Sequence, residues 1–334
     1  MAHPNPDGFM PPEWYKDENR KARMDMKAVS FASKKEKNTG TWAVIRKNKA
    51  GYAMMLPYLL AFFVFTILPV LASMLYSLMY FNGFSGMQFS GLTNYIRLFL
   101  RDDVFLIALK NTLVLAVITG PIGYLMCFGI AWLINELPPF VRAVMTLIFY
   151  APSISGQVYL IWQILFSGDY YGVINSFLVT TGIISEPIQW LTDTRYMMLV
   201  VIVVQLWLSL GAGFLAFIAG FQGVDRSLYE AAAVDGVRNR FQEAWYITLP
   251  VMKPILLFSA VMQITASFSI GAVPIALTGF PSTDYATHTI LTHLIDYGNT
   301  RFEIGYASAI AVVLFVMMVG ANRLIQRFLK NIGN

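Results

Sequence analysis

The sequence has little charge and almost no cysteine. Only 13% of its 334 residues are Asp, Glu, Lys or Arg, whereas 57% are hydrophobic, and an average soluble protein carries about 25% charged residues. The single cysteine, Cys127, excludes an intrachain disulfide and lies in an apolar run, where it is expected to act as a small apolar side chain. This composition is typical of a protein that lies largely within a membrane.

Charge is absent from the longest apolar runs. Six runs approach or exceed the roughly 20 residues that a helix needs to cross a bilayer, and none contains Asp, Glu, Lys or Arg before Arg323. Carriers driven by an ion gradient usually keep such a group inside the membrane, so its absence argues against that class, although backbone carbonyls can also hold sodium. The runs are 52–81, 112–134, 143–166, 196–221, 255–278 and 305–324.

The sequence also lacks the residue sets of an enzyme. The apolar runs contain no paired carboxylates and no Ser-His-Asp set, and no metal cluster is present. His288 and His293 lie five residues apart without a Cys or carboxylate at ligand spacing, so no metal site is expected. None of the 24 glycines is followed by Lys, so the ATP-binding pattern GxxxxGK[ST] does not occur. We therefore expect no cofactor bound by this chain and no catalysis by it.

The distribution of Lys and Arg predicts which side of the membrane each segment faces. If the amino terminus is cytoplasmic, 19 of the 24 Lys and Arg residues fall on the cytoplasmic side, 11 of them in residues 1–51. Cytoplasmic segments carry the excess of positive charge in membrane proteins, so both termini are predicted to be cytoplasmic. The net charge of +5 is then a topology signal, and it predicts no nucleic-acid partner because no basic patch is interleaved with aromatic residues.

The organisation follows from these runs. Residues 1–50 are polar and basic, without the features of a signal peptide, and they predict a mostly disordered cytoplasmic tail whose cations can lie on anionic lipid. Residues 51–334 predict an all-α membrane domain with six transmembrane helices. The segment 222–250, between the fourth and fifth spans, is then a cytoplasmic loop. Prolines in four spans, at positions 57, 69, 121, 152 and 274, predict kinked or broken helices that line a pathway.

Uncharged polar and aromatic side chains lie inside the third, fourth and fifth spans. Amides and hydroxyls supply paired donors and acceptors, and aromatic faces can stack on sugar rings, so the set suits an uncharged polyhydroxylated solute. For any one of these residues taken alone, a hydrogen bond across helices is the favoured interpretation, since Gln and Ser often form such bonds in membranes, but we expect at least one of the set to contact the solute. The candidates for the solute pathway are Gln157, Tyr159, Trp162, Gln163, Gln205, Trp207, Gln263 and Ser267.

The loop before the fifth span predicts a short helix with a signal at each end. Ser227 and Glu230 have the spacing of a capping box, and Gly236 stands where a left-handed residue can close the helix. Ala231 and Ala232 are strong helix formers with little bulk. A helix of about two turns is marginal in isolation, so we expect it to pack against a partner.

The same loop resembles a known motif. Glu230-Ala231-Ala232, then Asp235-Gly236, then Ile247-Thr248-Leu249-Pro250 resemble the EAA motif of the permease subunits of bacterial ABC importers. The resemblance extends to SGLTNYIRLF at 90–99, Ala151-Pro152-Ser153 and Gly305-Tyr306-Ala307-Ser308-Ala309, which look like the carbohydrate-uptake branch near the maltose and glycerol-phosphate permeases. Val237, and a spacing from Gly236 to Pro250 about one residue longer than in the maltose type, are departures in the second half of the loop.

The resemblance implies a function and a set of partners. In that family the EAA loop forms a coupling helix on a cytoplasmic ATPase dimer, which binds ATP and Mg, and an extracytoplasmic binding protein delivers the solute. It implies that Glu230, Ala231, Ala232, Asp235 and Gly236 carry this coupling, and that a second, similar permease completes the pathway. The expected location is the cytoplasmic membrane of a bacterium, and the expected cargo is a sugar or oligosaccharide. The alternative is a carrier or facilitator for a neutral polar solute that acts alone.

Overall fold

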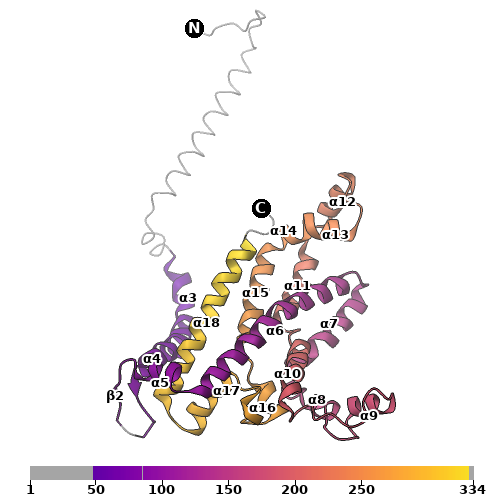
Figure 1. Ribbon diagram of the computed structural model, residues 1–334. Helices are drawn as coiled ribbons and strands as arrows, with labels where there is room; N and C mark the ends of the chain where they lie inside the picture. Colours follow the sequence, from indigo (N-terminus) through magenta and orange to yellow (C-terminus); the bar gives the residue numbers. More distant parts are fainter. Residues whose placement is uncertain (1–47, 85, 331–334) are drawn as a thin grey trace, which may run out of the picture. The chain divides into compact units, whose positions relative to one another are not determined.

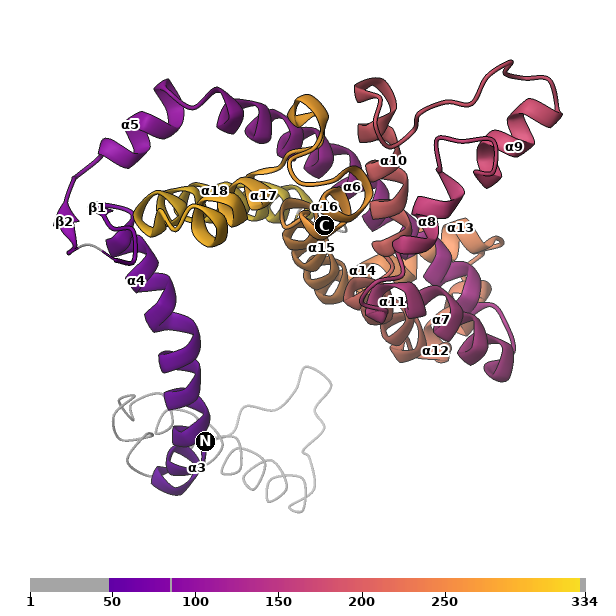
Figure 2. The ribbon, with the colours of Figure 1, turned by 90° about the horizontal axis from the view of Figure 1, so that it is seen from below.

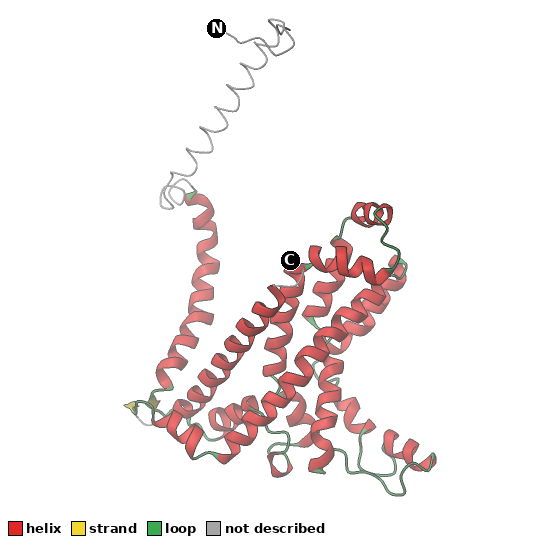
Figure 3. Cartoon of the chain, turned by 45° about the horizontal axis from the view of Figure 1, so that its top comes forward, coloured by secondary structure: helices red, strands yellow, loops and turns green. Residues whose placement is uncertain are grey.

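The part of the chain that the structure describes folds mostly into helices (Figure 3). The computed structural model describes residues 48–84 and 86–330, so almost all of the predicted tail, 1–50, lies outside the described residues. The structure divides into two compact units, Met1–Val70 and Leu71–Asn334. The only strands among the described residues are β1 (Met79–Tyr80) and β2 (Gln88–Phe89), which pair antiparallel and add a short hairpin to the predicted all-α fold.

The first apolar helix has no buried side. It comprises α3 (Lys49–Phe62), the π-helical η1 (Phe63–Ile67) and α4 (Leu68–Tyr76), and no residue of α3 is buried. A helix that is apolar all round is suited to lipid. It ends at Tyr76 rather than at the predicted residue 81, because the chain then turns into β1, where the Asn94 amide donates to the carbonyls of Ser77 (2.9 Å) and Met79 (3.0 Å).

Five of the six predicted spans are long apolar helices. Within the described residues, five helices have the length and composition to cross a membrane, and they overlap the first, second, fourth, fifth and sixth predicted runs. A long apolar helix is therefore confirmed at each of these five runs. They are Lys49–Tyr76, Asp103–Asn135, Thr194–Gly223, Lys253–Thr278 and Ile304–Arg327.

The third predicted run, 143–166, is not one continuous helix. It is divided into α7 (Pro139–Ile154), of 16 residues, and α8 (Leu160–Leu165), of six. Pro152 lies in the last turn of α7, and Ser155 is already extended with ψ of 108°. Because proline removes a backbone donor and clashes with the preceding turn, it weakens the helix at this point.

The second span is longer than predicted. α6 (Asp103–Asn135) runs without interruption for 33 residues, although the apolar run begins only at residue 112. Asp102 caps it, since its carboxylate accepts from the N–H of Phe105 at 2.9 Å. Such a cap satisfies a free N–H group of the first turn, so the helix begins at a polar sequence that hydropathy does not detect.

Breaks also divide the fourth and fifth spans. The fourth consists of α10 (Thr194–Leu208) and α11 (Ala212–Gly223), and the fifth of α15 (Lys253–Phe268) and α16 (Ala272–Thr278). Pro274 lies in the first turn of α16, where its missing N–H costs little. The break before α11 has no proline and contains Gly211, so the proline pattern predicts only part of these interruptions.

The helices of the second unit pack through three buried clusters. In one, Phe217 of α11 contacts Tyr124 and Phe128 of α6 edge-on, with ring centroids 5.4 and 5.5 Å apart. In another, α15 packs against α18 (Ile304–Lys330), which lies beside it in Figure 2. The remaining elements are α5 (Thr93–Leu100), α9 (Val173–Thr180), α12 (Arg226–Val234), α13 (Arg240–Glu243), π-helical η2 (Ala244–Thr248), α14 (Leu249–Val251), η3 (Thr283–Tyr285), α17 (Ile290–Ile295) and η4 (Asp296–Thr300).

The second unit has two distinct ends (Figure 1). α12 and α13 lie at one end, together with the turn between α6 and α7, and we call this the α12 end. α8, α9, α16 and α17 lie at the other, which we call the α17 end. The long helices α6 and α18 run between the two, so any coupling between the ends has to pass along such helices.

Candidate functional site

The short helix of the loop is present as α12, and its start differs from the prediction. Asp225 is the N-cap, and its carboxylate accepts from the N–H of Ser227 at 3.0 Å. Hydrogen bonds from Ser227 lower the pKa of Asp225. The predicted capping box of Ser227 with Glu230 was therefore wrong: the helix starts at Arg226, which places Ser227 inside the first turn, and a carboxylate is at least as good a cap as a hydroxyl.

The end of α12 is as predicted. Gly236 has a φ of +95°, the left-handed conformation that glycine adopts without strain. The N–H of Val237 donates to the carbonyl of Ala232 at 3.0 Å, and the N–H of Gly236 donates to that of Ala233 at 3.3 Å. These two bonds are those of the Schellman motif. The chain therefore leaves α12 in a defined direction.

The outer surface of this loop is uncovered and partly apolar. Val234 is 89% exposed, and Phe241, Trp245 and Tyr246 are 64–75% exposed. Contiguous exposed apolar surface next to polar residues marks an interaction site. Of the five predicted coupling residues, Glu230, Ala231, Asp235 and Gly236 are exposed, and Ala232 is half-buried against a core cluster. The structure thus presents the motif outward, and its coupling role stays a prediction.

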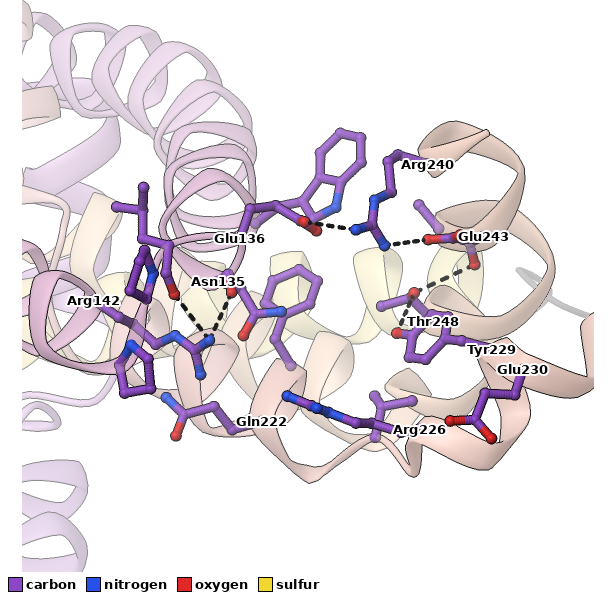
Figure 4. A pocket seen from close by; sticks show the side chains of 17 residues that line it. Asn135, Glu136, Arg142, Gln222, Arg226, Tyr229, Glu230, Arg240, Glu243 and Thr248 are labelled. Carbon is purple, nitrogen blue, oxygen red and sulfur yellow. Dashed lines mark hydrogen bonds and ion pairs between the residues drawn. The ribbon is translucent and has the colours of Figure 1, made fainter. Parts of the chain in front are cut away.

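The inner surface of the loop borders a cleft of about 630 Å³ (Figure 4). The hydroxyl groups of Tyr229 and Thr248 are hydrogen-bonded at 2.9 Å, which joins α12 to η2. The cleft is also lined by charged residues of α13 and of the α6–α7 turn, among them Glu136 and Arg240. The π-helical η2 lies in the loop's second half, where the sequence shows the longer spacing from Gly236 to Pro250.

A second, smaller cavity lies where the helices are interrupted. It has a volume of about 210 Å³, and Ser153, Ser209 and Gly211 line it from the interrupted third and fourth spans. Thr119 of α6 lines it too, and its backbone carbonyl accepts from the Gln263 amide at 3.1 Å. Interrupted membrane helices commonly form solute sites, because the interruption exposes polar backbone groups to a cavity.

The predicted pathway residues divide into two groups. Gln205, Gln263 and Ser267 line this cavity. Gln163 instead donates to the backbone carbonyl of Ala276, and Trp162 contacts Trp207 edge-on with centroids 5.4 Å apart. Gln157 is exposed and Tyr159 half-buried in the segment between α7 and α8, outside the cavity lining. Their roles in transport stay predictions.

A buried polar network at the α17 end was missed by sequence reasoning. The carboxylate of Asp102 accepts from the hydroxyl of Tyr306 at 2.6 Å and lies 3.0 Å from Nε2 of His293. His288 continues the network, with its Nε2 3.2 Å from Nδ1 of His293. The carboxylate that contacts His293 is not detectable from local sequence spacing, because Asp102 lies 191 residues before His293. These contacts join the start of α6 to α17 and α18.

The network shifts the pKa of two of its members. Burial raises the pKa of Asp102, but hydrogen bonds from His293, Tyr306 and the Phe105 N–H outweigh it and hold this pKa well below its usual range. Burial, together with a smaller contribution from the neighbouring His293, lowers the pKa of His288 to about 4. At neutral pH, Asp102 is therefore ionised and His288 is neutral.

The His288 shift predicts a loss of stability in acid. Between pH 6.5 and about 4 the unfolded chain binds a proton at this residue and the folded chain does not, so stability falls as the pH falls. At pH 5 the loss is about 2 kcal/mol relative to neutral pH. Thermal unfolding in detergent at pH 7.5 and pH 5 measures it. His288→Gln should reduce the difference between the two pH values, and an unchanged difference would contradict the assignment.

Proteins with similar sequences are known. No family model matches the chain. The probable ABC transporter permease protein YesP of Bacillus subtilis (strain 168) is 33% identical over 279 residues, which cover 82% of this chain and 88% of that protein. The lactose transport system permease protein LacF of Rhizobium radiobacter is 31% identical over 277 residues, which cover 80% and 90%.

A solved structure shares the fold. A crystal structure of a bacterial ABC transporter involved in the import of the acidic polysaccharide alginate contains a chain that superposes with a TM-score of 0.68 and 27% sequence identity. The match covers 86% of this chain and 98% of that chain. The match therefore extends over most of the length of both chains.

Proposed function

The chain belongs to the family of permease subunits of ABC transporters for carbohydrate uptake, and from this premise we propose that it conducts a sugar or oligosaccharide across the cytoplasmic membrane of a bacterium. In this proposal the chain is not an enzyme. ATP is bound with Mg and hydrolysed by a partner ATPase dimer, and the solute moves by alternating access. The chain itself holds no cofactor.

The observation that carries the proposal is the loop with α12. Its helix has a defined start at Asp225 and a defined end at Gly236, so the loop presents one fixed surface. That surface combines exposed Glu230 and small alanines with uncovered aromatic side chains. Small residues allow close approach of a partner, and the apolar area supplies affinity. We propose that an ATPase subunit covers it, and that the α12 end is cytoplasmic.

The cavity supports a neutral polyhydroxylated solute. Its lining consists of uncharged residues, among them Gln205, Gln263 and Ser267. Such groups can exchange hydrogen bonds with sugar hydroxyls without burying a charge. At about 210 Å³ the cavity has room for about one sugar ring. We therefore propose that an oligosaccharide passes through it one sugar ring after another. A charged cargo is disfavoured by this lining.

The remaining partners follow from the same premise. One solved neighbour is a bacterial alginate ABC transporter in complex with a periplasmic protein bound to an alginate pentasaccharide. We propose an analogous solute-binding protein at the α17 end, a second permease subunit beside this one, and α7 with α8 as the sixth span. Both termini then lie in the cytoplasm, and the apolar helices contact lipid.

Co-purification tests this proposal. The chain is expressed with the genes that neighbour it, extracted in detergent, and purified through its own tag. We expect an ATPase and a second permease in the complex, and we expect the co-expressed binding protein to bind members of a panel of neutral glycans. A chain that purifies alone and still mediates solute uptake would contradict the proposal and favour a carrier that acts alone.

Gln205 is the residue at which we expect a direct effect on the solute. Within the described residues its amide has no hydrogen-bond partner, whereas the Gln263 amide is bonded to Thr119. Gln205→Leu would leave a solute hydroxyl unpaired, which costs 1–3 kcal/mol and predicts an uptake rate about tenfold lower. Uptake by the reconstituted complex measures this. Gln157→Leu, outside the cavity, is the matched control, and an equal or larger effect there would contradict the assignment.

A further inference from the structure

The turn between α6 and α7 has a fixed shape. Arg142, in the first turn of α7, donates through its guanidinium to the backbone carbonyls of Asn135 (2.9 Å) and Leu137 (3.1 Å). A cation at the end of a helix satisfies carbonyls that have no partner within the helix. The last turn of α6 and the start of α7 are thereby held together as one piece.

Two contacts join this piece to α13. Arg240, the first residue of α13, lies 3.0 Å from the carboxylate of Glu136 and 2.7 Å from that of Glu243, so it bridges the end of α6 and its own helix (Figure 4). One turn further back along α6, the ring of Trp132 contacts Phe241 edge-on, with centroids 5.3 Å apart. A charged pair and an aromatic pair therefore lie side by side between α6 and α13. We call these four residues, Trp132, Glu136, Arg240 and Phe241, the α6–α13 clamp.

The clamp is connected to α12. The Tyr229 hydroxyl of α12 is bonded to the Thr248 hydroxyl at 2.9 Å, and Thr248 also donates to the carbonyl of Glu243 at 3.3 Å. A displacement of α12 is therefore passed to η2 and to the end of α13. Because Arg240 and Phe241 lie on that helix, the displacement reaches the clamp next.

Beyond the clamp, α6 leads to the solute cavity. Its 33 residues form one unbroken helix of about 50 Å. Thr119 on α6 lines the cavity, and Asp102 at its start holds the buried network of the α17 end. The third, fourth and fifth spans are interrupted at the level of the cavity, so they can bend there. α6, by contrast, stays helical through Pro121, where the sequence predicted a kink or break, and it connects the two ends directly.

We propose that the α6–α13 clamp is a positioning device for transport, which passes the movement of α12 to α6 and so opens or closes the cavity. The proposal rests on the proposed function, since it needs an ATPase that moves α12. The charged side chains of the clamp are only partly buried: that of Arg240 is 63% exposed and that of Glu136 is 42% exposed. A half-exposed pair contributes little to folding, so the effect of the clamp should appear in coupling rather than in stability.

The test replaces one charge at a time in the assembled complex. Arg240→Gln and Glu136→Gln should each lower the amount of solute transported per ATP hydrolysed by about threefold, the size expected for one partly exposed ion pair. Thermal stability and the amount of co-purified ATPase should not change. Arg238→Gln is the matched control: Arg238 is exposed two residues before Arg240, and its side chain has no ion-pair partner among the described residues. It should behave as the wild type.

A charge exchange distinguishes a specific contact from a general loss of charge. The triple variant Glu136→Arg, Arg240→Glu and Glu243→Arg restores both ion pairs with reversed signs. We expect it to regain most of the coupling that Arg240→Glu alone loses. Failure of the triple variant to recover, or a wild-type solute-to-ATP ratio in Arg240→Gln, would overturn the clamp.

The outcome also separates this inference from the function on which it rests. If the ATPase docks on α12 but Arg240→Gln transports solute with wild-type coupling, the clamp is wrong and the proposed function stands. If no ATPase co-purifies with the wild-type chain, the proposed function itself fails.

Discussion

Gly236→Pro is expected to abolish solute-stimulated ATP hydrolysis in the assembled complex while leaving the chain folded and inserted. Proline cannot adopt the φ of +95° observed here, and it removes the N–H that donates to Ala233. The cost is about 3 kcal/mol at the end of α12, which lowers the population of the docking geometry on the order of a hundredfold. ATP hydrolysis with and without solute, measured on purified complex, gives the ratio directly.

A second glycine provides the control for this variant. Gly182 closes α9 with a φ of +72°, and the N–H groups of Gly182 and Ile183 donate to the carbonyls of Val179 and Leu178, both at 3.0 Å. The local geometry is that of Gly236, but it lies at the α17 end (Figure 1). Gly182→Pro should therefore keep solute-stimulated ATP hydrolysis in the assembled complex. If it lost this stimulation as completely as Gly236→Pro, the effect would be a general loss of folding and the docking role would be contradicted.

Asp102→Ala is expected to cause the largest loss of stability. Its carboxylate is buried and accepts from the Phe105 N–H and the Tyr306 hydroxyl, and it pairs with His293. Removal leaves these buried groups without a partner and removes the cap of α6. Each buried group left without its acceptor costs about 1–3 kcal/mol, so the total loss expected is about 3–5 kcal/mol. Thermal unfolding of the purified chain in detergent should show a correspondingly lower midpoint.

A variant of the adjacent carboxylate, Asp103, is the control that distinguishes loss of the buried network from a general effect of removing a charge. Asp103 is exposed in the first turn of α6, where its charge can interact with the helix dipole, and no ion pair joins it to another described residue. Asp103→Ala should lower stability by less than about 1 kcal/mol. Equal losses for the two variants would show that the buried network does not stabilise the fold.

Hydropathy predicts where the long helices lie but not where they begin. Each confirmed span overlaps a run of apolar residues, because the bilayer selects for such runs. The start of α6 is different: residues 103–111 include Asp103 and Lys110 and become helical because Asp102 caps them. A cap depends on one side chain and its geometry, and a hydropathy window does not record it.

The sequence alone does not identify which polar residues line the cavity. Gln205, Gln263 and Ser267 are recognisable as polar residues in apolar runs, yet nothing in their spacing separates them from Gln157 or Gln163. The structure separates them because the interruptions in the third, fourth and fifth spans determine which side chains meet. The prolines at 152 and 274 mark the interruptions of the third and fifth spans in advance, but no proline marks that of the fourth. The interruption of the fourth span depends on packing between distant helices.

The short helix of the loop was predicted more closely. Its length and its closing glycine follow from local rules, since Gly236 adopts the left-handed conformation that the position requires. The cap was assigned to Ser227 because the capping-box spacing is common, but Asp225 precedes it and takes that role. The contacts that join the loop to α6, between Arg240 and Glu136, cross more than 100 residues and leave no mark in the sequence pattern.

The most direct test of the account is the energy dependence of uptake. Vesicles containing the complete complex, with binding protein at the α17 end and ATP at the α12 end, are compared with vesicles that contain this chain alone. We predict that solute accumulates only in the complete complex, only with hydrolysable ATP, and not with Gly236→Pro. Uptake at a similar rate by the chain alone, in vesicles without ATP, would contradict the account.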